Sequence, residues 1–303
     1  MFALLIVYIV WGTTYFAIGI ALQSMPPLLM NGARFVLAGI IMLAWARWDG
    51  QSWPTRHQWL CSALIGGLMA FGAMTLVVLA QHLGIGSGLM ATVVTTMPMW
   101  LALWTRIGGE PVPWTSWLGL ILGATGALLL VLEGDFSSTV LGTLCAFGAP
   151  LCWSLGSYAS RKLVQPPPAM ASGAQWLLGG ALGLLVAGLF EPQARSFDWQ
   201  QVSLASWLAW CYLLVMGTLV TLNAYLWLLK NTSAALAGSY SFVNPLVALW
   251  VGVALGGEGL TGWVFAAMPL ILMALLLILY GRSPLVLALL RWVQRGRTGR
   301  LAA

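Results

Sequence analysis

Charged residues are scarce in this sequence. Asp, Glu, Lys and Arg together make up 7% of its 303 residues, whereas about a quarter is usual in soluble domains. Hydrophobic residues make up 60%, and the mean hydropathy is +0.91. So few charged side chains cannot cover a soluble globular domain. The composition excludes that class and predicts an integral membrane protein, with the lipid bilayer as its surroundings.

Residues that carry catalytic or metal chemistry are also few. The four cysteines all lie in or beside apolar runs, and Cys145 and Cys152 are two helical turns apart, about 10 Å, too far for a disulfide. Both histidines, His57 and His82, lie at the ends of apolar runs. The sequence has no His-Glu-x-x-His motif and no paired aspartates at mid-membrane depth. We therefore expect no enzyme, no catalytic residues, no cofactor and no metal site.

Long apolar runs are abundant instead. A helical crossing needs roughly 20 apolar residues. Ten runs qualify: Phe2–Leu22, Leu28–Trp48, Gln58–Leu79, Gly88–Ile107, Thr115–Leu132, Val140–Ser160, Met170–Phe190, Val202–Trp227, Ala235–Leu255 and Thr261–Tyr280. They predict an all-α integral membrane fold with two five-helix halves, residues 1–133 and 139–281, followed by a basic cytoplasmic tail, residues 282–303.

The two halves share a motif. Pro98 lies in an apolar run that closes with Gly108-Gly109-Glu110, and Pro245 lies in one that closes with Gly256-Gly257-Glu258. An odd number of crossings separates the copies, which would turn the second copy upside down in the bilayer. We therefore expect two inverted repeats around a central cavity, which is a transporter architecture.

Basic residues fall almost entirely in alternate connections. One side receives Arg47, Arg56, Arg106, Arg161, Lys162, Lys230, Arg282, Arg291, Arg295, Arg297 and Arg300, and the other receives only Arg195. The excess of Lys and Arg marks the cytoplasmic side, so both termini are expected there, in a bacterial-type inner membrane. The same excess accounts for the net charge of +6. Nucleic acid is therefore not needed as a partner, and no obligate protein partner is evident.

Aromatic and polar residues at mid-membrane depth are the candidate binding residues. Trp11, Trp100 and Trp153 lie roughly 14 to 20 Å from the start of their spans, at about 1.5 Å per residue. A midplane indole has an N–H that lipid cannot satisfy and a face that attracts ammonium groups. The other candidates are the polar residues Tyr15, Thr96, Ser157, Tyr240 and Asn244. One interpretation is that these aromatic and polar residues line a small-molecule cavity. The alternative is that the indoles are packed in a core and the hydroxyls bond to their own helices.

Three further features bear on transport. Pro98 and Pro245 free a backbone carbonyl near the centre of their runs, which predicts kinks at a cavity wall or a packing role. Arg34 lies inside the second run with Asn31 one turn before it. It is a carboxylate anchor, a structural partner of Glu133 or another outer-side acid, or a side chain that snorkels to the interface. His82, near the outer end of the third run, is the sole conventional titrating candidate there, or an ordinary loop residue.

The ten spans, the Trp11-Gly12 and Ala33-Arg34-Phe35 sequences, and the repeated proline with Gly-Gly-Glu resemble the EamA family of the drug/metabolite transporter superfamily. Within it the chain looks most like YddG-type amino-acid exporters. The resemblance implies a central cavity that opens alternately to either side, and export of small metabolites. We expect neutral or zwitterionic substrates, such as amino acids with apolar or aromatic side chains. The alternative is export of aromatic or quaternary-ammonium drugs. A phosphate-bearing substrate would call for several cavity cations, and Arg34 alone is too few.

Overall fold

The computed structural model describes residues 2–131 and 140–256, and seven further positions between 266 and 277. Throughout these residues the chain is helical, with turns and short loops between helices. Glu133, Glu258, most of the expected tenth span and the basic tail lie outside the described residues. The all-helical part of the prediction is therefore confirmed for the described part of the chain.

Six helices in this part of the chain are long and apolar enough to cross a membrane. Four are continuous: α1 (Phe2–Ala21), α2 (Pro27–Trp48), α8 (Val140–Lys162) and α9 (Pro168–Phe190). The other two, Arg56–His82 and Leu204–Asn231, contain several elements each. The six correspond to the first, second, third, sixth, seventh and eighth predicted spans. α7 (Trp114–Val131) lies where the fifth was expected.

The third and eighth spans each change helix type in the middle. The third consists of α3 (Arg56–Gly66), the π-helix η1 (Gly67–Ala73) and α4 (Met74–His82). The eighth consists of α11 (Leu204–Tyr212), the π-helix η3 (Leu213–Val220) and α12 (Thr221–Asn231). π-helical turns are rare and occur frequently at functional sites. Nothing in the apolar sequences of these two segments predicts them.

The predicted fourth and ninth spans are interrupted. The fourth divides into α5 (Ser87–Val94) and α6 (Met97–Ile107), and Pro98 lies in the first turn of α6, where a proline is tolerated because its missing N–H would have no helical partner. The ninth divides into α13 (Ala234–Gly238) and α14 (Tyr240–Gly256). Pro245 lies inside α14 rather than at the interruption, which corrects the expectation that both prolines sit alike.

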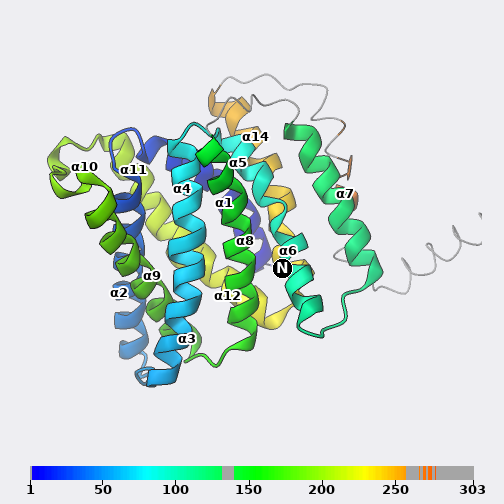
Figure 1. Ribbon diagram of the computed structural model, residues 1–303, viewed down its shortest axis with the longest axis horizontal. Coiled ribbons are helices and arrows are strands. Elements are labelled where there is room, and N and C mark those ends of the chain that lie inside the picture. Colours follow the sequence, from blue (N-terminus) through cyan, green and yellow to red (C-terminus); the bar gives the residue numbers. More distant parts are fainter. Residues whose placement is uncertain are drawn as a thin grey trace, which may run out of the picture.

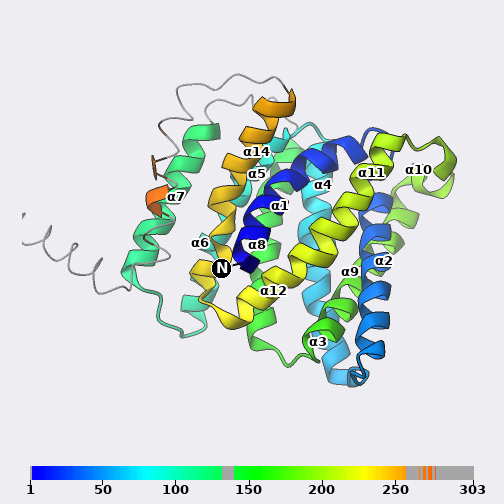
Figure 2. The same cartoon turned by 180° about the vertical axis from the view of Figure 1, so that it is seen from behind.

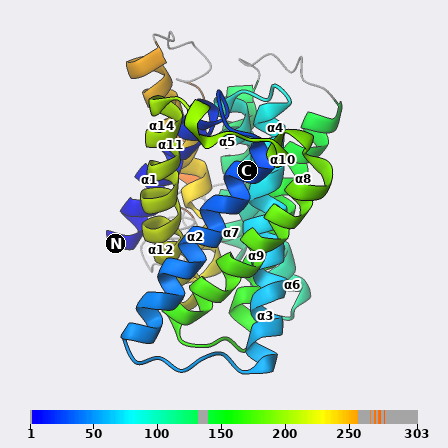
Figure 3. The same ribbon diagram turned by 90° about the vertical axis from the view of Figure 1, so that its left-hand side faces the viewer.

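Helices distant in the sequence pack side by side. α2 lies along α9, as Figure 3 shows, and α1 crosses the bundle against α14 and α12 (Figure 2). Glycines permit the approach of α2 and α9, because a Cβ on Gly180 would lie 2.5 Å from the backbone nitrogen of Val36. α5 packs on α14 while α6 packs on α13, so the two interrupted spans run antiparallel.

One buried acid joins the ends of α9 and α2. Glu191 follows the last residue of α9, and its two carboxylate oxygens accept hydrogen bonds from the backbone N–H groups of Leu28, at 3.1 Å, and Leu29, at 2.9 Å. The first N–H groups of a helix have no partner within the helix. Glu191 therefore satisfies the start of α2, a region made rigid by Pro26 and Pro27. The short helices α10 (Pro192–Arg195) and η2 (Trp199–Gln201) continue from it towards α11 (Figure 1).

Charge is distributed unevenly between the two ends of the bundle. Basic residues stand in the last turns of four helices and at the start of α3, all at the lower end in Figure 1: Arg47, Arg56, Arg106, Arg161, Lys162 and Lys230. The opposite end carries Glu191, Arg195 and Asp198. We call these the basic end and the opposite end.

Candidate substrate cavity

A narrow cavity lies in the middle of the bundle between α1, α2, α4, α8 and η3. Its walls are mostly apolar and include Trp11, Tyr15, Phe35, Pro150 and Trp153. The water-accessible part is about 60 Å³, which is room for about five water molecules at roughly 10–15 Å³ each. A metabolite would need the walls to move apart.

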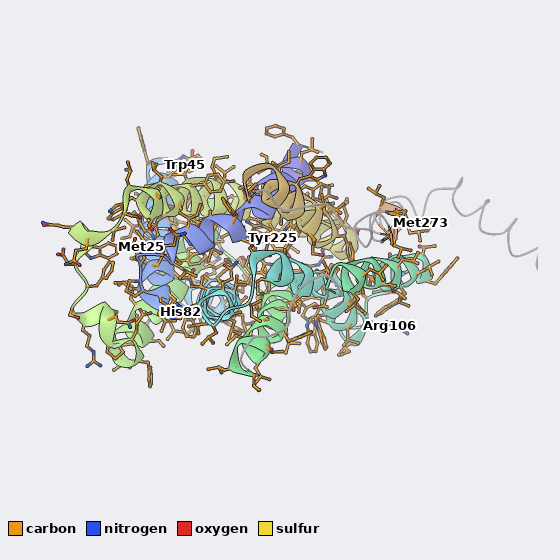
Figure 4. All side chains as sticks on the ribbon, turned by 90° about the horizontal axis from the view of Figure 1, so that it is seen from above. Met25, Trp45, His82, Arg106, Tyr225 and Met273 are labelled. Atoms are coloured by element: carbon orange, nitrogen blue, oxygen red, sulfur yellow. The ribbon has the colours of Figure 1, made fainter. Side chains whose placement is uncertain are left out.

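Four aromatic rings from four different helices pack together, and three of them, Trp11, Trp153 and Tyr240, line the cavity. Trp11 contacts Trp153, Tyr225 and Tyr240 with ring centroids 5.3, 5.1 and 4.7 Å away. Tyr225 also lies 5.6 Å from Trp153 and 5.4 Å from Tyr240. Edge-to-face and tilted contacts of this kind suit the charge distribution of aromatic rings. Figure 4, which looks along the bundle from above, shows Tyr225 at its centre and Trp45 and Arg106 at its periphery. We call these four residues the aromatic cluster.

The polar atoms of the aromatic cluster differ in their partners. The Nε1–H of Trp11 donates to the backbone carbonyl of Gly217 in η3 at 3.1 Å. The hydroxyl of Tyr225 bonds to Ser157 Oγ at 2.8 Å, and Ser157 in turn donates to the backbone carbonyl of Trp153. The Nε1 of Trp153, whose side chain is buried, has no hydrogen-bond partner. The aromatic cluster therefore contains one buried indole N–H without a hydrogen bond of normal geometry.

Arg34 is the cation of the cavity. Its side chain projects from α2, is buried to 2% exposure and lies with its guanidinium 4.6 Å from the ring centre of Phe35. Nη2 donates to Asn31 Oδ1 at 2.8 Å, while Nε is buried without a partner. Neither ion pair found among the described residues involves Arg34. Of the outer-side acids within the described residues, Glu191 is occupied by the start of α2 and Asp198 bonds to Gln200 and Gln201, while Glu133 lies outside the described residues. The burial of Arg34 opposes snorkelling.

Asn31 fixes the guanidinium against the third span. Its amide nitrogen donates to Thr75 Oγ1 at 3.3 Å and lies 3.5 Å from the backbone carbonyl of Ala70 in η1. Asn31 and Thr75 are both buried. The orientation of Arg34 is thus coupled to the π-helical turn, whose geometry leaves carbonyl groups available to side chains. Arg34 Nε takes no part in this network and remains a donor without a hydrogen bond.

Several predicted site residues lie elsewhere. Trp100 is 36% exposed and stacks on Trp104, so it does not share the cavity with Trp11 and Trp153. Thr96 donates to the carbonyl of Val93 in its own chain segment. Asn244 is buried, and the amide orientation that satisfies its nitrogen and oxygen lets the nitrogen donate to the backbone carbonyls of Tyr240 and Tyr8 at 3.1 and 3.2 Å. For Thr96 and Asn244 the structure thus favours the packing alternative.

The opposite end of the bundle has a second, wider recess. This outer hollow has a volume of about 570 Å³ and is lined by residues of α1, α4 and the following loop, including Gly19, Ile20, Gln81 and the exposed His82. Tyr15 lines both the outer hollow and the cavity. Gln81 donates to the backbone carbonyl of Tyr15 at 3.2 Å. Tyr15 therefore stands as a partition between the two spaces, while His82 lies outside the cavity.

Two residues of the site were not foreseen. Tyr225 belongs to the aromatic cluster, and Pro150, inside α8, lines the cavity one turn before Trp153. The available signals were a tyrosine in an apolar span five residues before a lysine and a proline inside the sixth apolar run. Neither signal separates a cavity wall from a packed core without knowledge of which helices face each other.

The chain matches the model of the EamA-like transporter family twice, over residues 1–132 and 140–280. The "Uncharacterized inner membrane transporter YedA" of Escherichia coli is 35% identical over 280 residues, covering 92% of this chain and 90% of the relative. The "Probable amino-acid metabolite efflux pump" of Salmonella typhimurium is 26% identical over 291 residues, covering 92% and 94%. One solved crystal structure superposes with a TM-score of 0.71 at 23% identity, covering 91% of this chain and 94% of that one, a likeness in fold alone. The chain therefore belongs to the EamA-like transporter family.

Proposed function

We propose that the protein is a secondary exporter of small zwitterionic metabolites, principally amino acids with apolar or aromatic side chains, and that it works by alternating access. Membership of a transporter family supports the general activity, and a relative named as an amino-acid metabolite efflux pump supports the substrate class. The cavity adds chemical support, because it holds a cation for the substrate's carboxylate and aromatic rings for its side chain.

The observation that carries the proposal is the unpaired, buried Arg34. A cation out of water is costly unless it is paired, and cations within membrane segments usually mark substrate or ion pathways. The described residues give Arg34 no acid, and its Nε lacks a partner. A guanidinium presents Nε–H and one Nη–H as a fork that matches a carboxylate. A substrate carboxylate would supply the missing charge.

The aromatic cluster provides the complementary surface. Trp11, Trp153 and Tyr240 line the cavity with broad faces that suit an apolar or aromatic side chain, and such faces also attract an ammonium group. Tyr225 packs against all three. This second property favours an alternative, export of aromatic or quaternary-ammonium cations. Arg34 opposes it, because a like charge in the same small cavity repels a cation. A zwitterion satisfies both parts of the site.

Alternating access requires two halves that move against each other. The proposed halves are residues 1–133 and 139–281, arranged as inverted repeats. The double family match, a π-helical turn in both the third and the eighth span, and the antiparallel packing of the fourth and ninth spans support this symmetry. Pro98 packs against Gly238 where these two spans cross, so both interrupted spans are candidate hinges together with η1 and η3.

We further propose that the basic end faces the cytoplasm, with both termini on that side of an inner membrane. The distribution of Lys and Arg between the two ends supports this orientation. Under it, the cavity receives substrate from the basic end and releases it through the outer hollow, past Tyr15.

Counterflow of labelled amino acids in proteoliposomes tests the proposal. Parent protein should exchange labelled phenylalanine or leucine, and Arg34→Gln should lower the rate by about ten- to a hundredfold, as expected when a hydrogen-bonded charge contact of roughly 1.5–3 kcal/mol is lost. Arg34→Lys keeps the charge without the forked pair of donors, so its exchange rate should lie between those of the parent and Arg34→Gln. Arg56→Gln, at an exposed site of the basic end, is the matched control and should behave as the parent.

A competition assay separates the two substrate classes. Tryptamine keeps the ring and ammonium of tryptophan but lacks the carboxylate. We expect tryptophan to compete well in the parent and tryptamine poorly, with the difference lost in Arg34→Gln. Tryptamine competing as well as tryptophan in the parent would favour the cation exporter and refute the carboxylate anchor.

A further inference from the structure

The Gly-Gly-Glu sequence after α6 ends in an ion-pair cluster with α8. Glu110 Oε1 lies 2.6 Å from Lys162 Nζ, and Glu110 Oε2 lies 3.8 Å from Arg161 Nη2. Arg161 and Lys162 are the last two residues of α8. The cluster thus joins the fourth span, in the first half of the chain, to the sixth span, in the second.

Each of the three motif residues, Gly108, Gly109 and Glu110, contributes to this contact. The N–H groups of Gly109 and Glu110 bond to the carbonyls of Arg106 and Thr105, the pattern of a helix end that needs a left-handed residue. Gly109 supplies it, with φ of +85°. A Cβ on Gly108 would lie 1.9 Å from Tyr158 Oη, so only glycine lets α8 approach here. Glu110 then emerges beside Arg161 and Lys162.

α8 is tied to a third span at the same level. Arg161 Nη1 donates to the backbone carbonyls of Leu229, at 2.8 Å, and Thr232, at 3.1 Å, at the end of α12. One helical turn nearer the cavity, Ser157 bonds to Tyr225. Between the cavity and the basic end, α8 is therefore fastened to both α6 and α12.

The matching positions in the first helix carry no basic side chains. The sequence from Trp11 to Gln23 aligns with that from Trp153 to Gln165 without a gap, and Ala17 aligns with Ala159. The residues that correspond to Arg161 and Lys162 are Gly19 and Ile20. Both line the outer hollow at the opposite end. Among the described residues, the ion pairs therefore stand at the basic end, while the outer hollow lies at the opposite end, where the counterparts of Arg161 and Lys162 are uncharged.

We propose that Glu110, Arg161 and Lys162 form an ionic latch that holds the basic end of the carrier closed and parts each time the cavity opens to that side. The inference rests on the alternating-access carrier proposed above. The latch groups are 20% to 41% exposed, and exposed ion pairs contribute little stability. Such a latch shifts the balance between two states by a small factor and still opens in every cycle.

Thiol labelling tests the latch without reference to any substrate. The reporter is Ser154→Cys in the full chain with the four native cysteines replaced by serine. Ser154 is fully buried and accepts a hydrogen bond from Trp104 Nε1 across the α6–α8 contact. A membrane-impermeant maleimide is applied to vesicles with the basic end outward. Glu110→Lys or Lys162→Glu should raise the labelling rate about two- to fivefold, the range for an exposed pair.

The charge swap decides between a latch and a loss of folding. Glu110→Lys combined with Lys162→Glu re-forms a pair and should return the labelling rate to within about twofold of the parent, whereas a folding defect would grow with the second substitution. Arg56→Glu, which changes a charge at the same end outside the latch, should leave the rate unchanged. Single variants that label at the parent rate, or a swap that labels faster than either, would overturn the proposal. Because labelling needs no substrate, failed amino-acid counterflow would leave this result standing.

Discussion

At the scale of single residues, the functional reading depends on which polar atoms lack partners. Arg34 Nε and Trp153 Nε1 are both buried donors beside the cavity without a hydrogen bond. Buried polar groups in native proteins are nearly always bonded, so unsatisfied donors in a cavity wall suggest a ligand. The predicted site residues Ser157, Thr96 and Asn244, by contrast, are satisfied within the protein and do not line the cavity. Chemical type alone did not separate these two groups.

Asn31 gives a prediction at this scale. It holds Arg34 Nη2 at 2.8 Å and is itself held by Thr75. Asn31→Ala should leave the guanidinium free to rotate and so raise the KM for amino-acid counterflow about tenfold, the cost of one hydrogen bond to a charged group of roughly 1.5 kcal/mol, with little change in maximal rate. The measurement is the concentration dependence of counterflow. A fall in maximal rate at unchanged KM would instead place Asn31 in the conformational change.

Gly108 gives a second residue-scale prediction, on stability. Gly108→Ala places a Cβ 1.9 Å from Tyr158 Oη, and overpacking of this kind costs about 1–3 kcal/mol. Thermal unfolding in detergent should show a lower midpoint, partly restored by Tyr158→Phe, which removes the hydroxyl. Gly19→Ala is the control, because a Cβ there meets nothing within 4 Å. An unchanged midpoint for Gly108→Ala would show that the contact is loose.

At the scale of helices, the continuous spans could be predicted from sequence and the interrupted ones could not. Uniform apolar runs such as α1 and α9 have one conformation available in lipid, since every backbone group must bond within the segment. η1 and η3 have ordinary apolar sequences, Gly67–Ala73 and Leu213–Val220, which give no sign of a π-helix. Pro245 lies inside α14 and is buried. A proline within a membrane helix is tolerated where neighbouring protein satisfies the backbone groups that it frees.

Helix α2 provides a prediction at the scale of elements. Its first N–H groups depend on Glu191 from the end of α9. Glu191→Ala would leave buried N–H groups unsatisfied and should cost about 1–3 kcal/mol, seen as a lower unfolding midpoint in detergent. Asp198→Ala is the matched control, because Asp198 caps only the short, exposed η2. Equal effects of the two substitutions would contradict a special role for Glu191.

At the scale of the whole molecule, the two ends of the bundle are not equivalent. The sequence predicted a shared Gly-Gly-Glu motif, and a duplicated motif alone implies equal ends. The two ends differ because α8 ends in Arg161 and Lys162, while α1 carries Gly19 and Ile20 at the matching positions. Which helix faces the motif is a property of the assembled bundle. A carrier with one latched end has a preferred resting state, here closed at the basic end.

The chemistry of the latch determines how this resting state responds to pH. The hydrogen bond from Lys162, aided by the charges of Lys162 and Arg161, lowers the pKa of Glu110 below its ordinary range. A carboxylate with a depressed pKa contributes its full stabilisation above the ordinary carboxyl pKa and loses it only as the pH falls through the lowered value. Histidine-based switches act between about pH 5 and 8, but the charged groups that face Glu110 among the described residues are Lys162 and Arg161.

We therefore expect the latch to stay closed throughout the physiological pH range. The quantity to measure is the labelling rate of Ser154→Cys in Glu110→Gln divided by that in the parent, because the ratio cancels the pH dependence of the thiol itself. It should be constant from pH 8 to about pH 5. A ratio that falls towards one with a midpoint near pH 6 to 7 would show that another titrating group controls the basic end. A constant ratio would mean that any coupling of transport to protons acts elsewhere than on this latch.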